Sequence, residues 1–360
     1  MIGVASGCPG RLVRAGLAAL LAGLLGGCAQ LGYLGQAVGG HWKLSQAARP
    51  VDQWLSQPDL DPVLRERLQL SQRLRDYAVS ALGLPDNASY RRYADLGRPA
   101  AVWNVVAAPP FSLRLKTWCY PLMGCAGYRG YFDYAAARSL AAQLQAEGWE
   151  VQVYPVPAYS TLGFGNWLGG DPLLNTFIRD GEGELAGLIF HELAHQQAYA
   201  ADDTEFNESY ATAVERMGAR RWLAEHGGAE AAVAYERQRR RRDEFLALAL
   251  RGRERLAAAY AQDLTPTARE DAKREALAAI QSDYRAWRDG PWQGWAGYDG
   301  WFARANNASF GVLAAYHGLV PAFERLFVAQ GSDWARFHAE VRRLAALPKS
   351  RRRLELGTSE

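Results

Sequence analysis

The stretch Leu188-Ile189-Phe190-His191-Glu192-Leu193-Ala194-His195-Gln196 decides the interpretation of this chain. It carries the pattern H-E-x-x-H in an apolar setting. Two histidines four residues apart on a helix project from the same face, so both imidazoles can reach one zinc ion. The glutamate between them can act on a water molecule held there. A buried apolar helix rarely carries such polar groups without a function. The pattern therefore predicts His191 and His195 as zinc ligands and Glu192 as the general base.

The bulk composition is that of a globular protein. The chain has 360 residues, of which 49% are hydrophobic and 22% charged, and its net charge of +3 gives no indication of a nucleic-acid partner. We expect a helical region at 28–98, a core with the zinc site at 99–230, a helical region completing the cleft at 231–350 and a disordered tail at 351–360. The sequence does not indicate an oligomeric state.

Residues 1–27 form an expected export signal. Arg11 and Arg14 precede an apolar stretch that is too short to span a bilayer and ends at Cys28. Small residues before this cysteine resemble the bacterial lipobox, in which the cysteine becomes lipidated. The alternative is an ordinary secretory signal with a chance cysteine. Because Ala29 and not Asp follows Cys28, we expect a lipid anchor in the outer membrane, facing the periplasm of the bacterial cell envelope.

Two further cysteines remain after export. Cys119 and Cys125 form an even pair in an oxidising compartment, and the loop between them contains Pro121 and Gly124. This spacing predicts a disulfide bond. Metal binding by the pair is the weaker alternative, because no histidine or third cysteine lies nearby in the sequence.

The order of hydrophobic patterns predicts a mostly helical α+β fold. Expected strands cover 100–107, 111–118 and 149–156, the last as an edge strand. Expected helices include 64–83, 90–93, 133–147, 182–200, 205–226 and 229–261, with Asp61 and Asp203 or Thr204 as N-caps. We expect a zincin-like domain in which a small mixed sheet covers one side of the metal-binding helix.

A catalytic zinc usually has three protein ligands and one position for water. Glu208, 13 residues after His195, follows Asn207 near the start of the next helix, and this Asn-Glu pair resembles the gluzincin arrangement. Glu215 lies 20 residues after His195, nearer the spacing of the thermolysin-like branch. The local pattern favours Glu208 as the ligand. Glu215 and Asn207 are the candidates for an alternative ligand or for a supporting contact to a ligand histidine.

The resemblance extends beyond the zinc motif. Matching segments are the lipobox at Cys28, Thr117-Trp-Cys-Tyr-Pro121, Tyr128-Arg-Gly-Tyr-Phe132, Ala158-Tyr-Ser-Thr-Leu-Gly163, His191-Glu-Leu-Ala-His195, Asp203-Thr-Glu-Phe-Asn-Glu208, Asn306-Asn-Ala308 and Val320-Pro-Ala-Phe323. Together they resemble the bacterial family of predicted zinc aminopeptidase lipoproteins. This resemblance covers nearly the whole mature chain and implies a zinc peptidase fold acting on a peptide substrate.

The expected chemistry is peptide hydrolysis by a zinc-activated water with Glu192 as the base. Tyr316 is the first candidate for the oxyanion donor, and Tyr159, Arg129 and His317 are candidates for the substrate cleft. An aminopeptidase also needs an acid for the substrate amine. The Glu-containing motif that serves this purpose in the large zinc aminopeptidases is absent between Val151 and Asp180, which leaves Asp171, Asp180 and Glu184.

Three alternatives remain open at this point. A zinc endopeptidase and a hydrolase of peptidoglycan cross-links would use the same metal chemistry on other substrates. A non-catalytic envelope lipoprotein stabilised by zinc is the alternative of another class. The complete H-E-x-x-H pattern argues against the last of these, because a structural zinc site has four protein ligands and no use for Glu192.

Overall fold

The computed structural model describes residues 33, 35–120, 124–158, 169–201, 203–313 and 318–357. Its strands are β1 (Arg49–Pro50), β2 (Arg92–Ala94), β3 (Val102–Ala108), β4 (Trp118–Tyr120), β5 (Gly124–Ala126), β6 (Arg129–Tyr131), β7 (Glu150–Val156) and β8 (Leu173–Leu174). Its α-helices are α2 (Val51–Leu55), α3 (Pro62–Ser80), α4 (Tyr134–Ala146), α5 (Glu182–Gln197), α6 (Thr204–Trp222), α7 (Gly228–Tyr260), α8 (Pro266–Asp289), α9 (Asp299–Arg304), α10 (Asn307–Leu313), α11 (Val320–Ala329), α12 (Trp334–Ala345) and α13 (Lys349–Glu355). A further helix lies at 35–47. The export signal, Cys28, Tyr159, Tyr316 and His317 lie outside the described residues.

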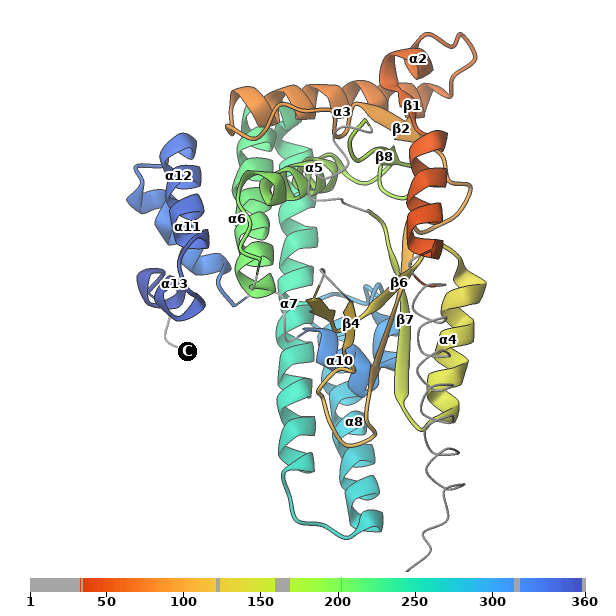
Figure 1. The fold of residues 1–360 in the computed structure, drawn as a ribbon. Coiled ribbons are helices and arrows are strands. Elements are labelled where there is room, and N and C mark those ends of the chain that lie inside the picture. The colour runs from red at the N-terminus through yellow and green to blue at the C-terminus, as the bar shows by residue number, and fades with distance from the viewer. Residues whose placement is uncertain are drawn as a thin grey trace, which may run out of the picture.

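Helices α5 and α6 form the centre of the molecule. The apolar side chains of α5, among them Leu185, Ile189 and Leu193, are completely buried. They pack against α6, and α3 and α7 are further neighbours of α5 (Figure 1). One hydrophobic core unites this pair with residues from Leu44 near the start to Leu356 near the end of the described chain. The helix that carries H-E-x-x-H is therefore held from several sides.

The predicted helix starts around this centre are confirmed. The Asp61 carboxylate accepts a hydrogen bond from the Leu64 backbone N–H at 2.7 Å, and Pro62 occupies the first helical position of α3. The Asp203 carboxylate caps α6 in the same way through the Phe206 backbone N–H. Helix α6 continues into α7 through a short π-helical segment, η2 (Leu223–Gly227). The two helices that we predicted here are thus joined almost without a break.

The main sheet has the strand order β6-β3-β7 and is entirely antiparallel. Helix α4 lies against it on one side, and α10 packs against β3 and β7 (Figure 1). The edge position of β7 confirms our prediction. The expectation that a mixed sheet from these segments covers the metal-binding helix is wrong, because the apolar residues of β3 are buried against α4 and α10.

A second small sheet joins β1, β2 and β8 beside the central helices. Strand β2 pairs antiparallel with β1 and parallel with β8. The predicted short helix at 90–93 is therefore wrong. Tyr90 has a positive φ of 64°, which interrupts a helix, and the following residues pair with β8 instead.

The segment after β3 is not the strand that its alternating pattern predicted. Residues 112–117 have no regular secondary structure. Leu115 packs against Gly311 of α10, so the apolar side of the segment is buried against a helix. Strands β4 and β5 follow and form a hairpin that the disulfide bond between Cys119 and Cys125 closes. The predicted pairing of these two cysteines is present.

Helices α7, α8, α9 and α10 share a core of aromatic residues. Tyr284, Trp292 and Phe302 are buried in it, and the rings of Tyr284 and Phe302 stack at 4.1 Å. Trp292 thus anchors the loop at 290–300 in this core. Across the described part of the chain, no helix has the length and apolar character needed to cross a membrane.

The C-terminal segment is ordered, and our expectation of a disordered tail from residue 351 is wrong as far as residue 357. Helix α13 is anchored by two buried arginines. Arg352 and Arg353 donate to the buried carboxylate of Asp203 at 2.7 and 2.8 Å. Because Asp203 also caps α6, α13 is tied to the start of the helix that carries Glu208.

Candidate metal centre

The candidate metal centre is built by two neighbouring helices, and the helical repeat places the donor side chains of each on one face. His191 and His195 lie one turn apart on α5, and their rings meet edge to face with centroids 4.9 Å apart. The chain turns at 198–203 and returns as α6, which brings Glu208 opposite the two histidines. Among the described residues, these three form a group whose potential ligand atoms all lie within 4.8 Å of one another.

The distances show that the three side chains converge on one point. The two Nε2 atoms of His191 and His195 are 3.2 Å apart. The Glu208 carboxylate lies 3.4 Å from His191 Nε2 and 3.8 Å from His195 Nε2, one oxygen facing each ring. The structure therefore brings the predicted ligand set together from α5 and α6.

Glu215 contacts the opposite side of His191. Its carboxylate lies 3.0 Å from His191 Nδ1, so that Nδ1–H donates to it and Nε2 faces Glu208. Arg242 of α7 lies 3.7 Å from the other Glu215 oxygen. Gly187 makes the close packing possible, because a Cβ there would lie 3.0 Å from the Glu215 side chain. Glu208 and Glu215 thus lie on opposite sides of the His191 ring, one at Nε2 and the other at Nδ1.

The charges of this group strongly affect its protonation. Burial by itself lowers the pKa of His191, but hydrogen bonds to Glu208 and Glu215 raise it to about 10. Burial and the neighbouring His191 charge lower the pKa of His195 to about 4. Burial opposes ionisation of Glu215, yet the His191 hydrogen bond and nearby arginines lower its pKa to about 2. The centre therefore stabilises a positive charge between its carboxylates.

Asn207 does not take part in the metal centre, contrary to our expectation of a supporting contact or alternative ligand. Its side-chain amide donates to the Ala200 carbonyl and accepts from the Ala200 backbone N–H, both at 2.7 Å. This pair of bonds closes the turn between α5 and α6. Asn207 thus fixes where α6 begins, and with it the position of Glu208.

The other candidates lie at different places. Arg129 is on β6, where its guanidinium lies over the ring of Tyr33 at 4.3 Å, and this contact belongs to the sheet layer. Glu184 lies in the first turn of α5, about two helical turns or ~10 Å before His191. Asp171 is buried, and its backbone contacts Ser89 and Tyr90. Since Ser89 also accepts a hydrogen bond from Gln196, Asp171 lies toward the C-terminal half of α5.

A comparison with protein families identifies the chain. The model of the family described as "Putative aminopeptidase" matches residues 32–356. The chain belongs to this family. Comparison with curated proteins and with solved structures gives no match. The matched residues include α3, the sheets and the candidate metal centre, so all of these elements lie within one family unit.

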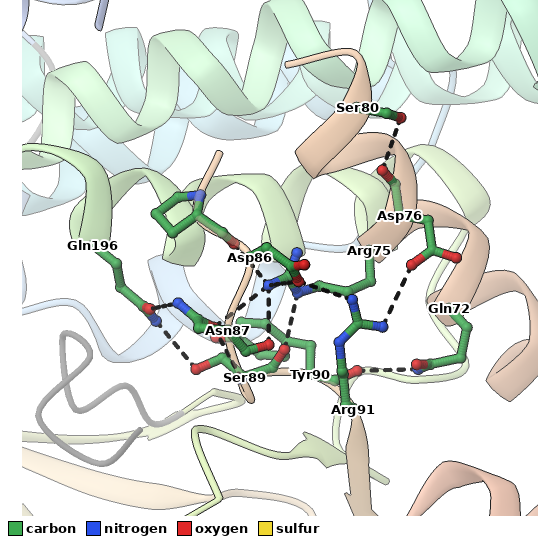
Figure 2. Close-up of polar contacts among 11 residues, drawn as sticks. Gln72, Arg75, Asp76, Ser80, Asp86, Asn87, Ser89, Tyr90, Arg91 and Gln196 are labelled. Atoms are coloured by element: carbon green, nitrogen blue, oxygen red, sulfur yellow. Dashed lines mark hydrogen bonds and ion pairs between the residues drawn. The ribbon is translucent and has the colours of Figure 1, made fainter. Parts of the chain in front are cut away.

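A second polar group lies beside α5 in this member of the aminopeptidase family, and no sequence motif indicated it. Figure 2 shows Arg75 of α3 bonded to the loop at 85–89, and Asn87 and Ser89 of this loop beside Gln196. The guanidinium is fully buried, and the acid that the structure places beside it, Asp86, is mostly exposed. The sequence feature that could have indicated this group is Arg75, a charged residue on the apolar face of α3. Its neighbours on this face are Ser71, Leu74 and Ala78.

Proposed function

We propose that this protein is a zinc-dependent aminopeptidase of the bacterial cell envelope. The observation that carries the proposal is the convergence of His191, His195 and Glu208, with Glu215 on the far nitrogen of His191. The description of the family supports peptide hydrolysis as the reaction class.

The donor atoms suit zinc by their chemistry. Two imidazole nitrogens and one carboxylate oxygen form the three-ligand set typical of catalytic zinc, which leaves one position for water. Two imidazole Nε2 atoms only 3.2 Å apart, next to a carboxylate, are placed to bind one shared cation. The contact between His191 Nδ1 and Glu215 is the supporting interaction that orients metal-binding histidines in other zinc sites.

The chemistry can be divided between the metal and the protein. When bound, zinc supplies Lewis acidity for the scissile carbonyl and lowers the pKa of the attacking water. Glu192, between the two histidines on α5, accepts a proton from that water and passes it to the leaving amine. His191, His195 and Glu208 hold the metal, and Glu215 keeps the His191 ring in place. Tyr316 remains the proposed oxyanion donor.

The test of this mechanism is the variant Glu192→Gln. We expect it to bind one zinc per chain like the wild type and to lose peptide hydrolysis, by at least about 100-fold. Zinc content is measured by elemental analysis and activity on peptides with free N-termini. Glu230→Gln, an exposed residue of α7, is the matched control and keeps full activity. Full activity of Glu192→Gln would exclude Glu192 as the base.

Substrate choice separates aminopeptidase activity from its alternatives. We expect cleavage of peptides with a free amine and none of the same peptides after N-acetylation. Equal cleavage of both would identify an endopeptidase, and cleavage of muropeptides alone would identify a hydrolase of peptidoglycan cross-links. A zinc-containing wild type that cleaves none of these would favour the non-catalytic lipoprotein.

The location in the cell is part of the proposal. The basic and apolar segments before Cys28 support export and lipidation at that residue, and Ala29 supports sorting to the outer membrane. The disulfide bond between Cys119 and Cys125 supports an oxidising compartment such as the periplasm.

A further inference from the structure

Residues 85–91 form a loop whose backbone is organised by one buried side chain. Arg75 of α3 donates to the carbonyls of Pro85 at 2.7 Å, Ser89 at 3.0 Å and Asn87 at 3.1 Å (Figure 2). Asp86 lies 3.7 Å from the guanidinium, and its side chain is mostly exposed. Because the Arg75 guanidinium donates hydrogen bonds to three backbone carbonyls, it fixes the path of the loop. Its main role is therefore not that of a partner in an ion pair.

The loop is also attached directly to the metal-binding helix. Asn87 donates to the Gln196 side-chain oxygen at 2.7 Å, and the Gln196 amide donates to the Ser89 hydroxyl at 3.3 Å. Gln196 lies four residues after Glu192, so both project from the same face of α5. Residues 87–90 are therefore held against the face of α5 that carries the proposed general base.

Tyr90 stands out within this loop for two reasons. Its φ of 64° lies in the left-handed region, which a bulky residue rarely adopts and which often marks functional sites. Its side chain is 1% exposed, and its hydroxyl is buried without a hydrogen-bond partner among the described residues. A buried hydroxyl without a partner lowers the free energy of unfolding, so its presence here points to a functional role.

The electrostatic surroundings of Tyr90 agree with this placement. Burial raises the pKa of the Tyr90 hydroxyl well above 10, and the nearby charges of Glu192 and then Asp171 raise it further. The hydroxyl thus keeps its proton and can act as a donor to a carboxylate. Glu192 is the acid whose charge acts on it most strongly.

We infer that Tyr90 is a positioning residue for Glu192: its hydroxyl donates to the Glu192 carboxylate in the working enzyme, and the loop that Arg75 organises holds the ring in place. The hydrogen bond selects the side-chain conformation in which Glu192 accepts the proton of the attacking water. The inference rests on the proposed role of Glu192 as the base.

The first experiment is a double-mutant cycle that does not depend on activity. Melting temperatures are compared for the zinc-loaded wild type, Tyr90→Phe, Glu192→Ala and the double variant. We expect Tyr90→Phe to lower the melting temperature when Glu192 is present and to have no such effect in the Glu192→Ala protein, because the acceptor is then gone. An equal shift in both backgrounds would overturn the inference.

The second experiment separates positioning from a structural role. We expect Tyr90→Phe to lower kcat about 10- to 100-fold, with KM and zinc content unchanged. Tyr93→Phe is the matched control, because Tyr93 is buried on β2 and its acidic neighbour is Asp95 and not Glu192. Unchanged kcat in an active Tyr90→Phe enzyme would overturn the inference. If the wild type cleaves no peptide, the proposed function fails, whereas the thermal cycle still decides whether Tyr90 contacts Glu192.

Discussion

Glu208 and Glu215 lie on the same face of α6 but reach different nitrogen atoms of His191. Glu208 faces Nε2, where a metal would bind, and Glu215 faces Nδ1, where only a proton is held. The sequence named both residues, and its local pattern favoured Glu208 as the ligand. It could not settle the choice, because this depends on how far α6 is shifted along α5, and the Asn207–Ala200 bonds set that shift.

These roles predict different losses of zinc affinity. We expect Glu208→Gln to abolish stoichiometric zinc binding, because one of three ligands is lost. Glu215→Gln should weaken binding about 10- to 100-fold, as is typical when the partner of a ligand histidine is removed. Competition with a chromophoric chelator measures both affinities, with Glu230→Gln as the control. A stronger loss for Glu215→Gln than for Glu208→Gln would reverse the assignment.

At the scale of elements, α13 and α6 are joined by a buried ion pair. Arg352 and Arg353 converge on Asp203, which caps α6 five residues before Glu208. A charged run near the chain end usually indicates disorder, and only the packing shows that two of these arginines are buried. The C-terminal helix therefore supports the helix that carries the third proposed ligand.

Removal of Arg352 from the buried ion pair with Asp203 should destabilise the fold. We expect Arg352→Ala to lower the free energy of unfolding by about 3–5 kcal/mol, because the Asp203 carboxylate loses a buried partner. Zinc affinity should fall as well. Chemical denaturation checks the first effect and chelator competition the second. The neighbouring variant Arg351→Ala, whose side chain is 65% exposed, should stay within about 0.5 kcal/mol of the wild type. Equal stability of the two variants would contradict a supporting role for α13.

Helix α12 carries a histidine on its buried face. His338 is 1% exposed, and its Nε2–H donates to the Leu82 carbonyl at 2.8 Å. Its Nδ1 therefore accepts from the Tyr210 hydroxyl, also at 2.8 Å. Burial lowers the pKa of His338 to about 4. The neutral ring thus joins α12 to α6 and to the end of α3.

This histidine predicts a loss of stability in acid. The unfolded chain binds a proton at His338 near pH 6.5, whereas the folded chain binds it only near pH 4. The neutral His338 ring therefore contributes about 3 kcal/mol to the free energy of unfolding above pH 6.5. This contribution is lost as the pH falls to 4. Urea denaturation between pH 7.5 and 4 measures the change. His338→Gln should remove this part of the pH dependence, and the exposed His226→Gln should not. Identical pH profiles for wild type and His338→Gln would refute the prediction.

At the scale of the whole molecule, the sheet layer and the helical layers are joined by buried polar contacts. Lys273 of α8 bonds to Glu150 of β7, and the Asn307 backbone N–H donates to the same carboxylate at 2.7 Å. The Asn307 side chain donates to the carbonyls of Pro109 and Pro110. These bonds connect the ends of β3 and β7 with α8 and α10, away from the metal centre.

The proposed membrane anchor is also a property of the whole molecule. Lipidation at Cys28 predicts that the wild-type chain fractionates with membranes. We expect Cys28→Ser to abolish metabolic labelling with palmitate and to release the protein from the membrane fraction. Zinc binding and peptidase activity should remain unchanged, because the metal centre is built from α5 and α6. An unlabelled wild type would indicate an ordinary secretory signal.

The sequence by itself determined whatever depends on local periodicity and residue chemistry. It placed His191, Glu192 and His195 on one helix face, named Glu208 and Glu215, paired Cys119 with Cys125 and located β3, β7 and most helices. Each of these follows from a repeat of two or 3.6 residues or from a short spacing.

The tertiary structure decided whatever depends on contacts between distant segments. It placed the sheet between α4 and α10 and not over α5, assigned Asn207 to the turn before α6, and ordered α13 through Asp203. It also brought Tyr90, about a hundred residues before the zinc motif, to the face of α5 that carries Glu192. No local pattern contains this information, because burial and pairing of a polar residue depend on the partner that folding brings to it.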